Sequence, residues 1–359
     1  MPYPPDYGGV IDIYNRIRSL NEIGVEIILH CFQYGRQKSQ ELELLCREVH
    51  YYQRYSGIKY IIDPRPYIVI TRSSPTLIDN LTHDQYPVLF EGIHTSYFIN
   101  NPVLKNRVRI LRTHNIEHDY YRGLYKVESS PFKKTFFFIE YKKLKRYEQN
   151  LPEDIIIAAI SPGDTDYFSH RYQNTLNIPP FHPFDKLSCL TGRGKYILIH
   201  GDLSVPVNIH STIYLVEKVL YQLPFQVIIS GKDPAHKILN IGVRYSNISI
   251  RVNPDDQEMH ELVRNAQINL IHSYQPHGIK LKLLTALFSG RHCLANPEAV
   301  RNSSLESLCH IGENTEQMKD LVYKLMEVPF TREDIQKRET ILKVNYSNRE
   351  NARKIYGII

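Results

Sequence analysis

Short apolar runs alternate with helical patterns along the chain, most regularly in its second half. Runs rich in Ile, Val and Leu predict buried strands, and apolar positions spaced three and four apart predict helices. The predicted strands of the second half cover residues 195–201, 225–230, 248–252, 267–271 and 292–295. The predicted helices between them cover about 208–222, 234–240, 255–265 and 279–288. This order is typical of a parallel α/β sheet with helices on both faces.

In the first half, strand and helix patterns alternate less regularly. Val10, Ile13, Tyr14, Ile17 and Leu20 share one face of a predicted helix. Further apolar runs cover residues 25–32, 67–70, 87–90, 108–111 and 155–160. The loop PYPPDYGG leads directly into the first helix, although the first strand of a doubly wound sheet is normally central. We therefore expect that the recorded start is late and that roughly 6–10 residues of strand precede it.

The length of 359 residues suggests two domains. Residues 177–194 contain three Pro and two Gly between the last strand of one half and the first strand of the other. We place domain boundaries at 1–180 and 195–340, with residues 181–194 as the linker. Two doubly wound domains facing a cleft are the expected architecture, with ligands at the carboxyl ends of the strands.

Composition excludes several classes of protein. The formal charge of +6 comes without a dense basic stripe, which argues against a dedicated nucleic-acid binder. The longest apolar run has six residues, Ile155–Ile160, whereas a membrane span needs about 20. Five Cys without a CxxC pair indicate reduced thiols in a cytosolic protein. The only Asp-x-Asp, Asp164–Asp166, fits a turn before a helix, so we predict no essential metal.

The clearest candidate for chemistry is a pair of lysines at a predicted helix start. Gly278 ends a strand–loop segment, the helix is predicted from Ile279, and Lys280 and Lys282 fall in its first turn. A helix N-terminus carries unpaired N–H groups and a partial positive charge, so two cations there oppose the helix dipole unless an anion binds. A nucleotide diphosphate is such an anion. A solvated helix start is the alternative.

Three other candidates also follow predicted strands. Gly201 ends the strand KYILIHG, and Gly231–Lys232 ends the strand FQVIISG. Lys232 could reach a phosphate, and a plain turn with an exposed Lys explains it equally well. His114 follows the run at 108–111 in Thr-His-Asn, where an imidazole could hydrogen-bond a sugar or a departing phosphate. A histidine that merely holds a loop is the alternative.

Several motifs resemble one known family. They are PYPPDYGG, RILRTHNIEHDYY, ISPGDTDYF, IHGDLSVPVN, IISGKDP and HGIKLKLLTALFSGRHCLAN. Their order and spacing resemble the GT-B retaining glycosyltransferases that act on nucleotide sugars, of the bacterial surface-polysaccharide type. The resemblance implies two Rossmann-like domains, with the donor in the C-terminal domain and residues 341–359 packing back on the N-terminal domain. It implies a catalytic role for His114 and an acceptor-side loop at Gly8 and Gly9. The donor-binding residues it implies are Gly201, Lys232, Gln275, Gly278, Lys280, Lys282 and Thr285.

The implied activity is transfer of a sugar, with retention of configuration, from a nucleotide diphosphate sugar to a glycan or lipid-linked acceptor in cell-surface polysaccharide synthesis. Neither a cofactor nor a metal is expected. Related enzymes carry two Glu where this chain has Gln275 and Thr285. A non-catalytic subunit that binds a sugar nucleotide or a partner is therefore the alternative. A sugar-nucleotide epimerase would need carboxylate acid/base pairs, and none is convincingly placed.

A basic and aromatic segment at residues 133–146 completes the candidates. It contains six Lys or Arg and three consecutive Phe, at 136–138. Such a segment is typical of a surface that lies on anionic lipid. A solvated face over core phenylalanines is the alternative. We expect a cytoplasmic protein. If the segment lies on lipid, the protein contacts the inner face of the cell membrane.

Overall fold

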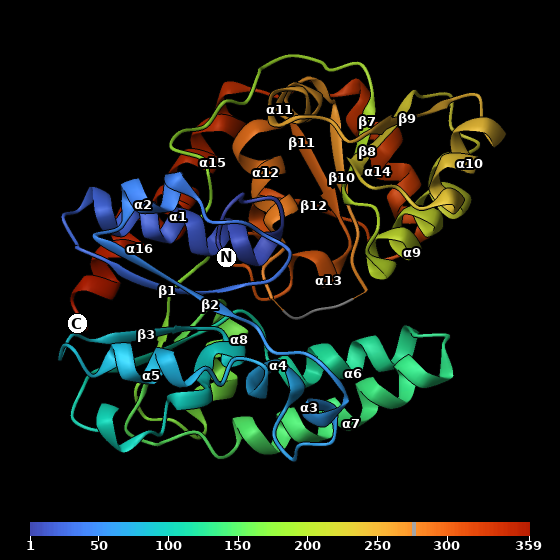
Figure 1. Cartoon of the computed structure of the whole chain (residues 1–359). Helices are drawn as coiled ribbons and strands as arrows, with labels where there is room; N and C mark the ends of the chain where they lie inside the picture. Colours follow the sequence, from blue (N-terminus) through green and yellow to red (C-terminus); the bar gives the residue numbers. More distant parts are fainter. Residues whose placement is uncertain (275–277) are drawn as a thin grey trace. The chain divides into compact units, whose positions relative to one another are not determined.

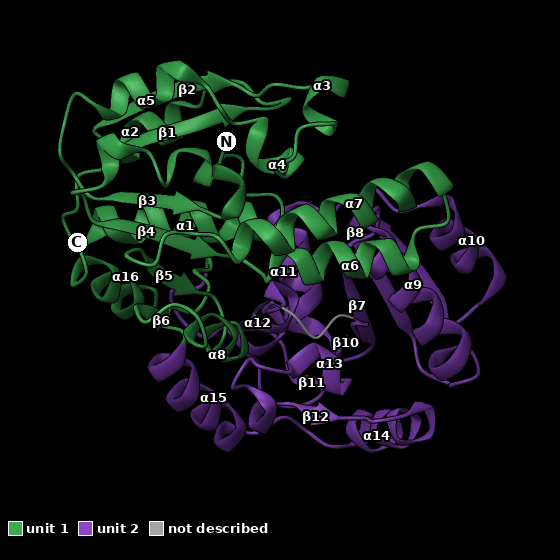
Figure 2. Ribbon diagram, turned by 90° about the horizontal axis from the view of Figure 1, so that it is seen from below, with its two compact units in different colours: residues 1–183, 346–359 green, residues 184–345 purple. Residues whose placement is uncertain are grey.

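The computed structural model describes residues 1–274 and 278–359. The chain forms two compact units (Figure 2), one made of residues 1–183 and 346–359 and the other of residues 184–345. The chain thus crosses between units after Pro183 and again after Asn345. The sequence analysis ended the two domains at residues 180 and 340 and placed residues 181–194 in a linker, whereas residues 184–194 belong to the second unit.

In the described part of the second unit, six strands form one parallel sheet in the order β12-β11-β10-β7-β8-β9 (Figure 1). The strands are β7 (Ile197–Asp202), β8 (Val227–Lys232), β9 (Ile248–Val252), β10 (Ile268–Ile271), β11 (His292–Ala295) and β12 (His310–Ile311). The chain runs outward from β7 to one edge and then from β10 to the other. The switch point between β7 and β10 is where a doubly wound sheet binds its ligand.

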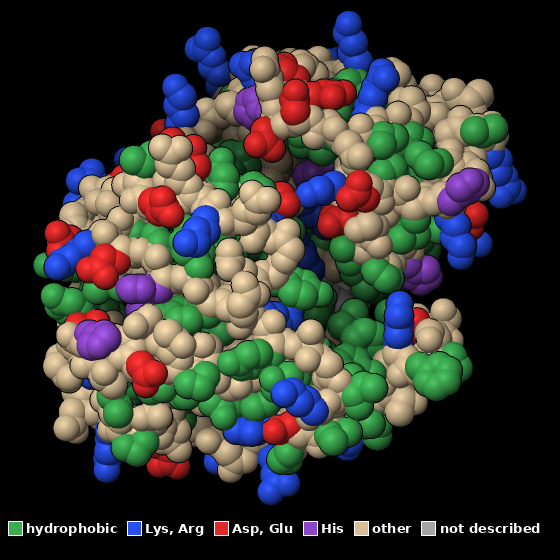
Figure 3. Space-filling model, viewed as in Figure 1, with side chains coloured by type: hydrophobic (Ala, Val, Ile, Leu, Met, Phe, Trp, Pro, Cys, Tyr) green, Lys and Arg blue, Asp and Glu red, His purple; other side chains and the backbone are tan. Residues whose placement is uncertain are grey.

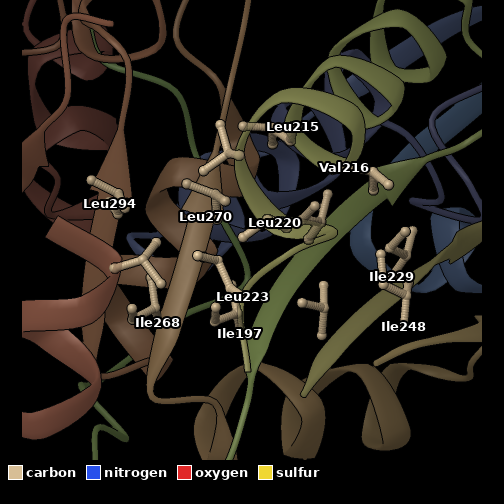
Figure 4. Close-up of a cluster of buried hydrophobic side chains, with 14 of the residues drawn as sticks. Ile197, Leu215, Val216, Leu220, Leu223, Ile229, Ile248, Ile268, Leu270 and Leu294 are labelled. Atoms are coloured by element: carbon tan, nitrogen blue, oxygen red, sulfur yellow. The ribbon is translucent and has the colours of Figure 1, made fainter. Parts of the chain in front are cut away.

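Helices connect these strands. They are α9 (Pro206–Leu215), the π-helical turn η3 (Val216–Leu220), α10 (His236–Arg244), α11 (Asp256–Asn265), α12 (Leu281–Ser289), α13 (Pro297–Val300), η4 (Glu306–Leu308), α14 (Thr315–Glu327) and α15 (Arg332–Asn345). Figure 4 shows how the core forms: Leu215 and Leu220 face Ile197, Ile268 and Leu270 on the sheet. All five side chains are buried, so this face of the sheet is held by apolar contact.

The first unit contains a four-stranded parallel sheet and a separate parallel pair, β1 with β2. The strands are β1 (Ile28–Gln33), β2 (Glu48–Gln53), β3 (Val88–Glu91), β4 (Arg109–Thr113), β5 (Ile156–Ala159) and β6 (Thr175–Asn177). The helices are α1 (Gly8–Glu22), α2 (Gln40–Leu45), α3 (Ile58–Ile61), α4 (Tyr67–Ile70), α5 (Pro75–Leu81), η1 (Ile93–Phe98), η2 (Pro102–Leu104), α6 (Glu117–Val127), α7 (Pro131–Glu148), α8 (Pro162–Ser169) and α16 (Asn348–Tyr356).

The C-terminal helix α16 belongs to the first unit although α15 belongs to the second. Figure 1 shows α16 beside α1, and Ala352 and Ile355 share a buried cluster with Leu20 of α1. The segment that joins the first unit thus begins at Tyr346, whereas the sequence analysis placed its start at residue 341.

The apolar run at residues 67–70 forms the short helix α4, not a strand. Pro66 is the N-cap of this helix, a position where its missing backbone N–H removes no hydrogen bond within the helix. Within the described residues, no helix is both long enough and apolar enough to cross a membrane.

Candidate functional site

The helix that carries the lysine pair begins two residues later than predicted. Lys280 has extended backbone angles (φ −82°, ψ 108°) and precedes the first residue of α12, Leu281. The prediction of a helix from Ile279 was therefore wrong, and only Lys282 lies in the first turn. The Lys280 ammonium donates to the backbone carbonyl of Gly278 at 3.0 Å, and Gly278 has a φ of +67°. Lys280 thus lies in the loop that leads into the helix.

Lys282 reaches the switch point of the sheet. Its Nζ donates to the carbonyl oxygen of His272 at 3.0 Å and lies 3.4 Å from Oδ1 of Asn208. His272 follows β10, and Asn208 lies in the first turn of α9, which follows β7. The ammonium group is therefore held at the carboxyl ends of the two strands between which the chain reverses direction.

The electrostatic surroundings of Lys282 favour an incoming anion. Burial lowers the pKa of Lys282 to about 8. Burial, and next the Lys282 charge, lower the pKa of His200 to about 3 and that of His272 to about 4, so both imidazoles are neutral near pH 7. Among the described residues, no carboxylate forms an ion pair with Lys282. A buried ammonium without a counter-charge is costly, and a bound anion would relieve that cost.

Two glycines shape the same edge of the sheet. Gly201 on β7 pairs with Gly231 on β8, and a Cβ atom on Gly231 would lie 1.8 Å from the Gly201 carbonyl oxygen. Gly201 has a φ of +152°, which disfavours a side chain. Next to it, Asn208 Nδ2 donates to the carbonyl of Asp202 at 2.8 Å, which ties the loop after β7 to α9. These contacts leave little room for residues larger than glycine.

The remaining second-unit candidates differ in their placement. Lys232 is the exposed last residue of β8, at the same edge of the sheet. The Thr285 hydroxyl donates to the carbonyl of Leu281 at 3.1 Å, within its own helix. Gln275 lies outside the described residues.

In the first unit, His114 lies next to the glycine loop. His114 follows the last residue of β4, and Gly8 and Gly9 open α1. A Cβ atom on Gly9 would lie 4.0 Å from His114 Nδ1. The first turn of α1 contains no acidic residue, and no side chain caps it. The positive end of this 15-residue helix is therefore close to the imidazole of His114.

The sequence analysis missed the charged network beneath His114. Asp12 accepts hydrogen bonds from Arg16 at 2.9 Å, from Arg112 at 3.3 Å and from the backbone N–H of Phe181 at 2.7 Å. Arg16 also pairs with Glu91, which ends β3. Burial acts to raise the pKa of Asp12, but the two guanidinium groups outweigh it and hold the pKa well below its usual range.

This network also acts on His114. Its Nε2 lies 3.3 Å from Oδ2 of Asp12 and 3.6 Å from Oε2 of Glu91. Burial acts to lower the pKa of His114, but the two carboxylates outweigh burial and raise it above its ordinary value. The ring of His94 lies 6.4 Å away, and burial, followed by the charges of Arg72 and His114, holds its pKa well below the usual range. His114 is thus the imidazole that favours the protonated form, which suits it to donate a hydrogen bond to an oxygen atom.

Other chemistry is less well supported by the geometry. Asp164 is buried behind the helix cap that Ser161 makes for α8, and Asp166 lies in the same helix. No group of three His, Cys, Asp or Glu among the described residues could hold a metal ion. A cavity of about 310 Å³ lies at the carboxyl ends of β10, β11 and β12, beside Tyr214 and Glu298. None of the site residues that the sequence predicts and the structure describes lines this cavity.

Comparison with known proteins points to one fold. No protein-family model matches the sequence. An uncharacterized 44.6 kDa protein in the cps region of Klebsiella pneumoniae is 28% identical over 305 residues, which cover 80% of this chain and 78% of that protein. Sucrose-phosphate synthase from Thermosynechococcus elongatus has a TM-score of 0.66 at 13% identity, covering 98% of this chain and 92% of that one. Anabaena HepE in complex with UDP and glucose has a TM-score of 0.63 at 10% identity, covering 96% and 95%.

The two structural matches extend over almost the whole chain, and they agree with the two α/β units and their parallel sheets. At 10–13% identity they establish the fold, whereas the activity has to be argued from the site. The chain has the GT-B fold of the nucleotide-sugar glycosyltransferases.

Proposed function

We propose that the protein is a glycosyltransferase that moves a sugar from a nucleoside diphosphate sugar to a glycan or lipid-linked acceptor. The observation that carries the proposal is the buried Lys282 ammonium, which has no carboxylate partner among the described residues and lies at the switch point beside the Gly201 loop. The structure of HepE with UDP and glucose supports a nucleotide sugar as the donor.

The second unit binds the diphosphate in this proposal. Lys282 and the first N–H groups of α12 stabilise the negative charge that develops as the diphosphate leaves. Gly278 and Lys280 contribute from the loop before α12, and Lys232 contributes from the end of β8 on the same edge. His114 donates a hydrogen bond to the reacting sugar, and transfer retains the anomeric configuration without a metal or other cofactor. The Klebsiella relative in the cps region supports a role in cell-surface polysaccharide synthesis.

His114→Ala tests this function. We expect kcat for sugar transfer or donor hydrolysis to fall about tenfold, because a charge-assisted hydrogen bond made in the transition state is lost. The Kd for UDP is expected to stay within about twofold, because Lys282 holds the diphosphate. The measurements are turnover with a panel of UDP- and GDP-sugars and calorimetric titration with UDP. The exposed His83 provides the control, His83→Ala. Unchanged turnover in a folded His114→Ala protein would contradict the assigned role.

A second candidate is a non-catalytic subunit that binds a sugar nucleotide or a partner. The Thr285 hydroxyl favours it, because this group bonds within its own helix, where related enzymes have a Glu. Wild-type protein that binds UDP but neither transfers nor hydrolyses any donor of the panel would establish this candidate.

The α6–α7 hairpin supports peripheral contact with an anionic membrane. Residues 117–148 contain eight Lys and Arg against five Asp and Glu, and two of the five, Glu140 and Glu148, are buried inside the unit. Phe132 is the second residue of α7 and is 90% exposed, and Val127 at the end of α6 is 52% exposed. Figure 3 shows hydrophobic and cationic side chains together at the outer end of this hairpin. We propose that this end inserts into the headgroup region of anionic lipid.

Phe132→Ser is expected to weaken binding to vesicles of phosphatidylglycerol and phosphatidylcholine about tenfold, because burial of a Phe side chain is lost. The measurement is co-sedimentation at low salt. Val243→Ser is the matched control, since Val243 on α10 is 89% exposed. Equal binding by Phe132→Ser and wild-type protein would show that the hairpin does not enter the membrane.

A further inference from the structure

Two arginines of the first unit lie side by side without a carboxylate partner. Arg54 follows β2, and Arg72 follows α4. The backbone N–H of Tyr55 donates to the carbonyl of Thr71 at 2.9 Å, and Arg54 Nε lies 3.3 Å from the Thr71 hydroxyl. The two guanidinium groups therefore come from segments that are hydrogen-bonded to each other.

The contacts of these arginines are with neutral groups. Arg72 Nη1 donates to the carbonyl of Ile68 at 2.6 Å. The Arg54 guanidinium lies over the ring of Tyr34, at 4.6 Å from its centre. No carboxylate in the described part of the chain forms an ion pair with either. Burial, and next the Arg54 charge, lower the pKa of Arg72 to about 10.

Elsewhere in the first unit, deeply buried arginines are compensated. Arg16 and Arg112 pair with Asp12, Arg107 pairs with Asp84 at 2.6 Å, and Arg109 pairs with Asp154. Arg54 and Arg72 depart from this pattern. Two adjacent like charges without a counter-ion destabilise the empty protein and are offset when an anion binds.

Apolar side chains are exposed next to this pair. Ile58 on α3 and Ile62 at its end are each 78% exposed, and they follow Arg54 closely in the chain. Tyr55 stacks on Tyr60 of α3, with ring centres 5.6 Å apart, which fixes the helix beside the arginine segment. A ligand whose anionic group met the guanidiniums could therefore place an apolar part on α3.

We propose that Arg54 and Arg72 bind the phosphate group of an amphiphilic phosphate ester, whose apolar part contacts Ile58 and Ile62. Paired guanidiniums match the oxygens of a phosphate and bind it through charge-assisted hydrogen bonds. The assignment rests on the proposed function: because the second unit holds the donor diphosphate there, the first unit is left to receive the acceptor. The assignment makes that acceptor a phosphate-bearing lipid.

The test uses farnesyl phosphate as the probe, with farnesol and inorganic phosphate as its two halves. Arg54→Ala and Arg72→Ala are each expected to weaken farnesyl phosphate binding by about tenfold or more. Wild-type protein is expected to bind farnesol and inorganic phosphate more weakly than the ester. Arg47→Ala is the matched control, because Arg47 is exposed and pairs with Glu26 at 3.2 Å. Arg54→Lys and Arg72→Lys retain the charge and are expected to lose less affinity than the Ala variants.

Several results would overturn the inference. Both Ala variants could bind farnesyl phosphate like wild-type protein, or inorganic phosphate could bind as tightly as the ester. Loss of UDP binding in the same variants would assign the arginines to the donor. If Arg72→Ala fails to fold, Arg54→Ala gives the same decision. Arginine-dependent binding of farnesyl phosphate by a protein that does not bind UDP would leave this site standing while the proposed function fails.

Discussion

Lys282→Ala is expected to weaken UDP binding about 10- to 100-fold, because an ammonium–phosphate contact in a desolvated site contributes roughly 1.5–3 kcal/mol. The geometry selects Lys282 from the pair. Its Nζ already lies between the loops after β7 and β10, whereas the Lys280 ammonium donates to Gly278 in its own loop. The measurement is calorimetric titration of UDP and GDP into both single variants.

Two controls sharpen this experiment. Lys218→Ala removes an exposed Lys of η3 and is expected to leave UDP affinity unchanged. Wild-type affinity is expected to fall as the pH rises past about 8, where the Lys282 ammonium loses its proton, and Lys282→Ala is expected to lack this dependence. If the Lys280 and Lys282 variants both bind like wild-type protein, the donor site is elsewhere and the argument for a transferase fails.

The strands of the second unit were predicted from their apolar runs. β9 and β11 have the predicted bounds, and β7, β8 and β10 differ from theirs by at most two residues at either end. Strands covered on both faces are continuous apolar runs, which are conspicuous in a sequence. The run at 67–70 is equally apolar but forms helix α4. An apolar run of only four residues does not distinguish a strand from a buried helical turn.

The candidate site was also predicted only in part. Gly201, Lys232 and His114 were predicted as site residues because they end or follow predicted strands, and a parallel sheet brings its carboxyl ends to one edge. The bond from Arg112 to Asp12 joins residues 100 positions apart, and no local pattern predicts such a pair. One signal was present: Asp12, Arg16 and Ser19 form a polar stripe on α1 and are each 1% exposed. Buried polar residues at helical spacing need partners, and here the partners come from other parts of the unit.

The largest effect on the free energy of unfolding is expected from a substitution in this polar stripe. Asp12→Ala removes the carboxylate shared by Arg16, Arg112 and the backbone N–H of Phe181. Breaking a buried ion pair on one side leaves uncompensated charge, which costs about 3–5 kcal/mol of unfolding free energy. This contribution is fully present above the ordinary Asp pKa of about 4. It decreases as the pH falls below that value and is lost as the pH falls through the lowered pKa of Asp12 in the folded protein, where the wild-type carboxylate becomes protonated.

Urea unfolding at pH 7, followed by circular dichroism, measures this loss. Asp63→Ala is the matched control: Asp63 pairs with the exposed Arg65 at 2.8 Å, and such a pair contributes about 0–1 kcal/mol. Asp12→Asn keeps a hydrogen-bond acceptor for the Phe181 N–H and is expected to fall between the two. If Asp12→Ala unfolds at the same urea concentration as Asp63→Ala, the charged network beneath His114 does not hold α1 against β4. The Asp12 carboxylate would then not explain the raised pKa of His114.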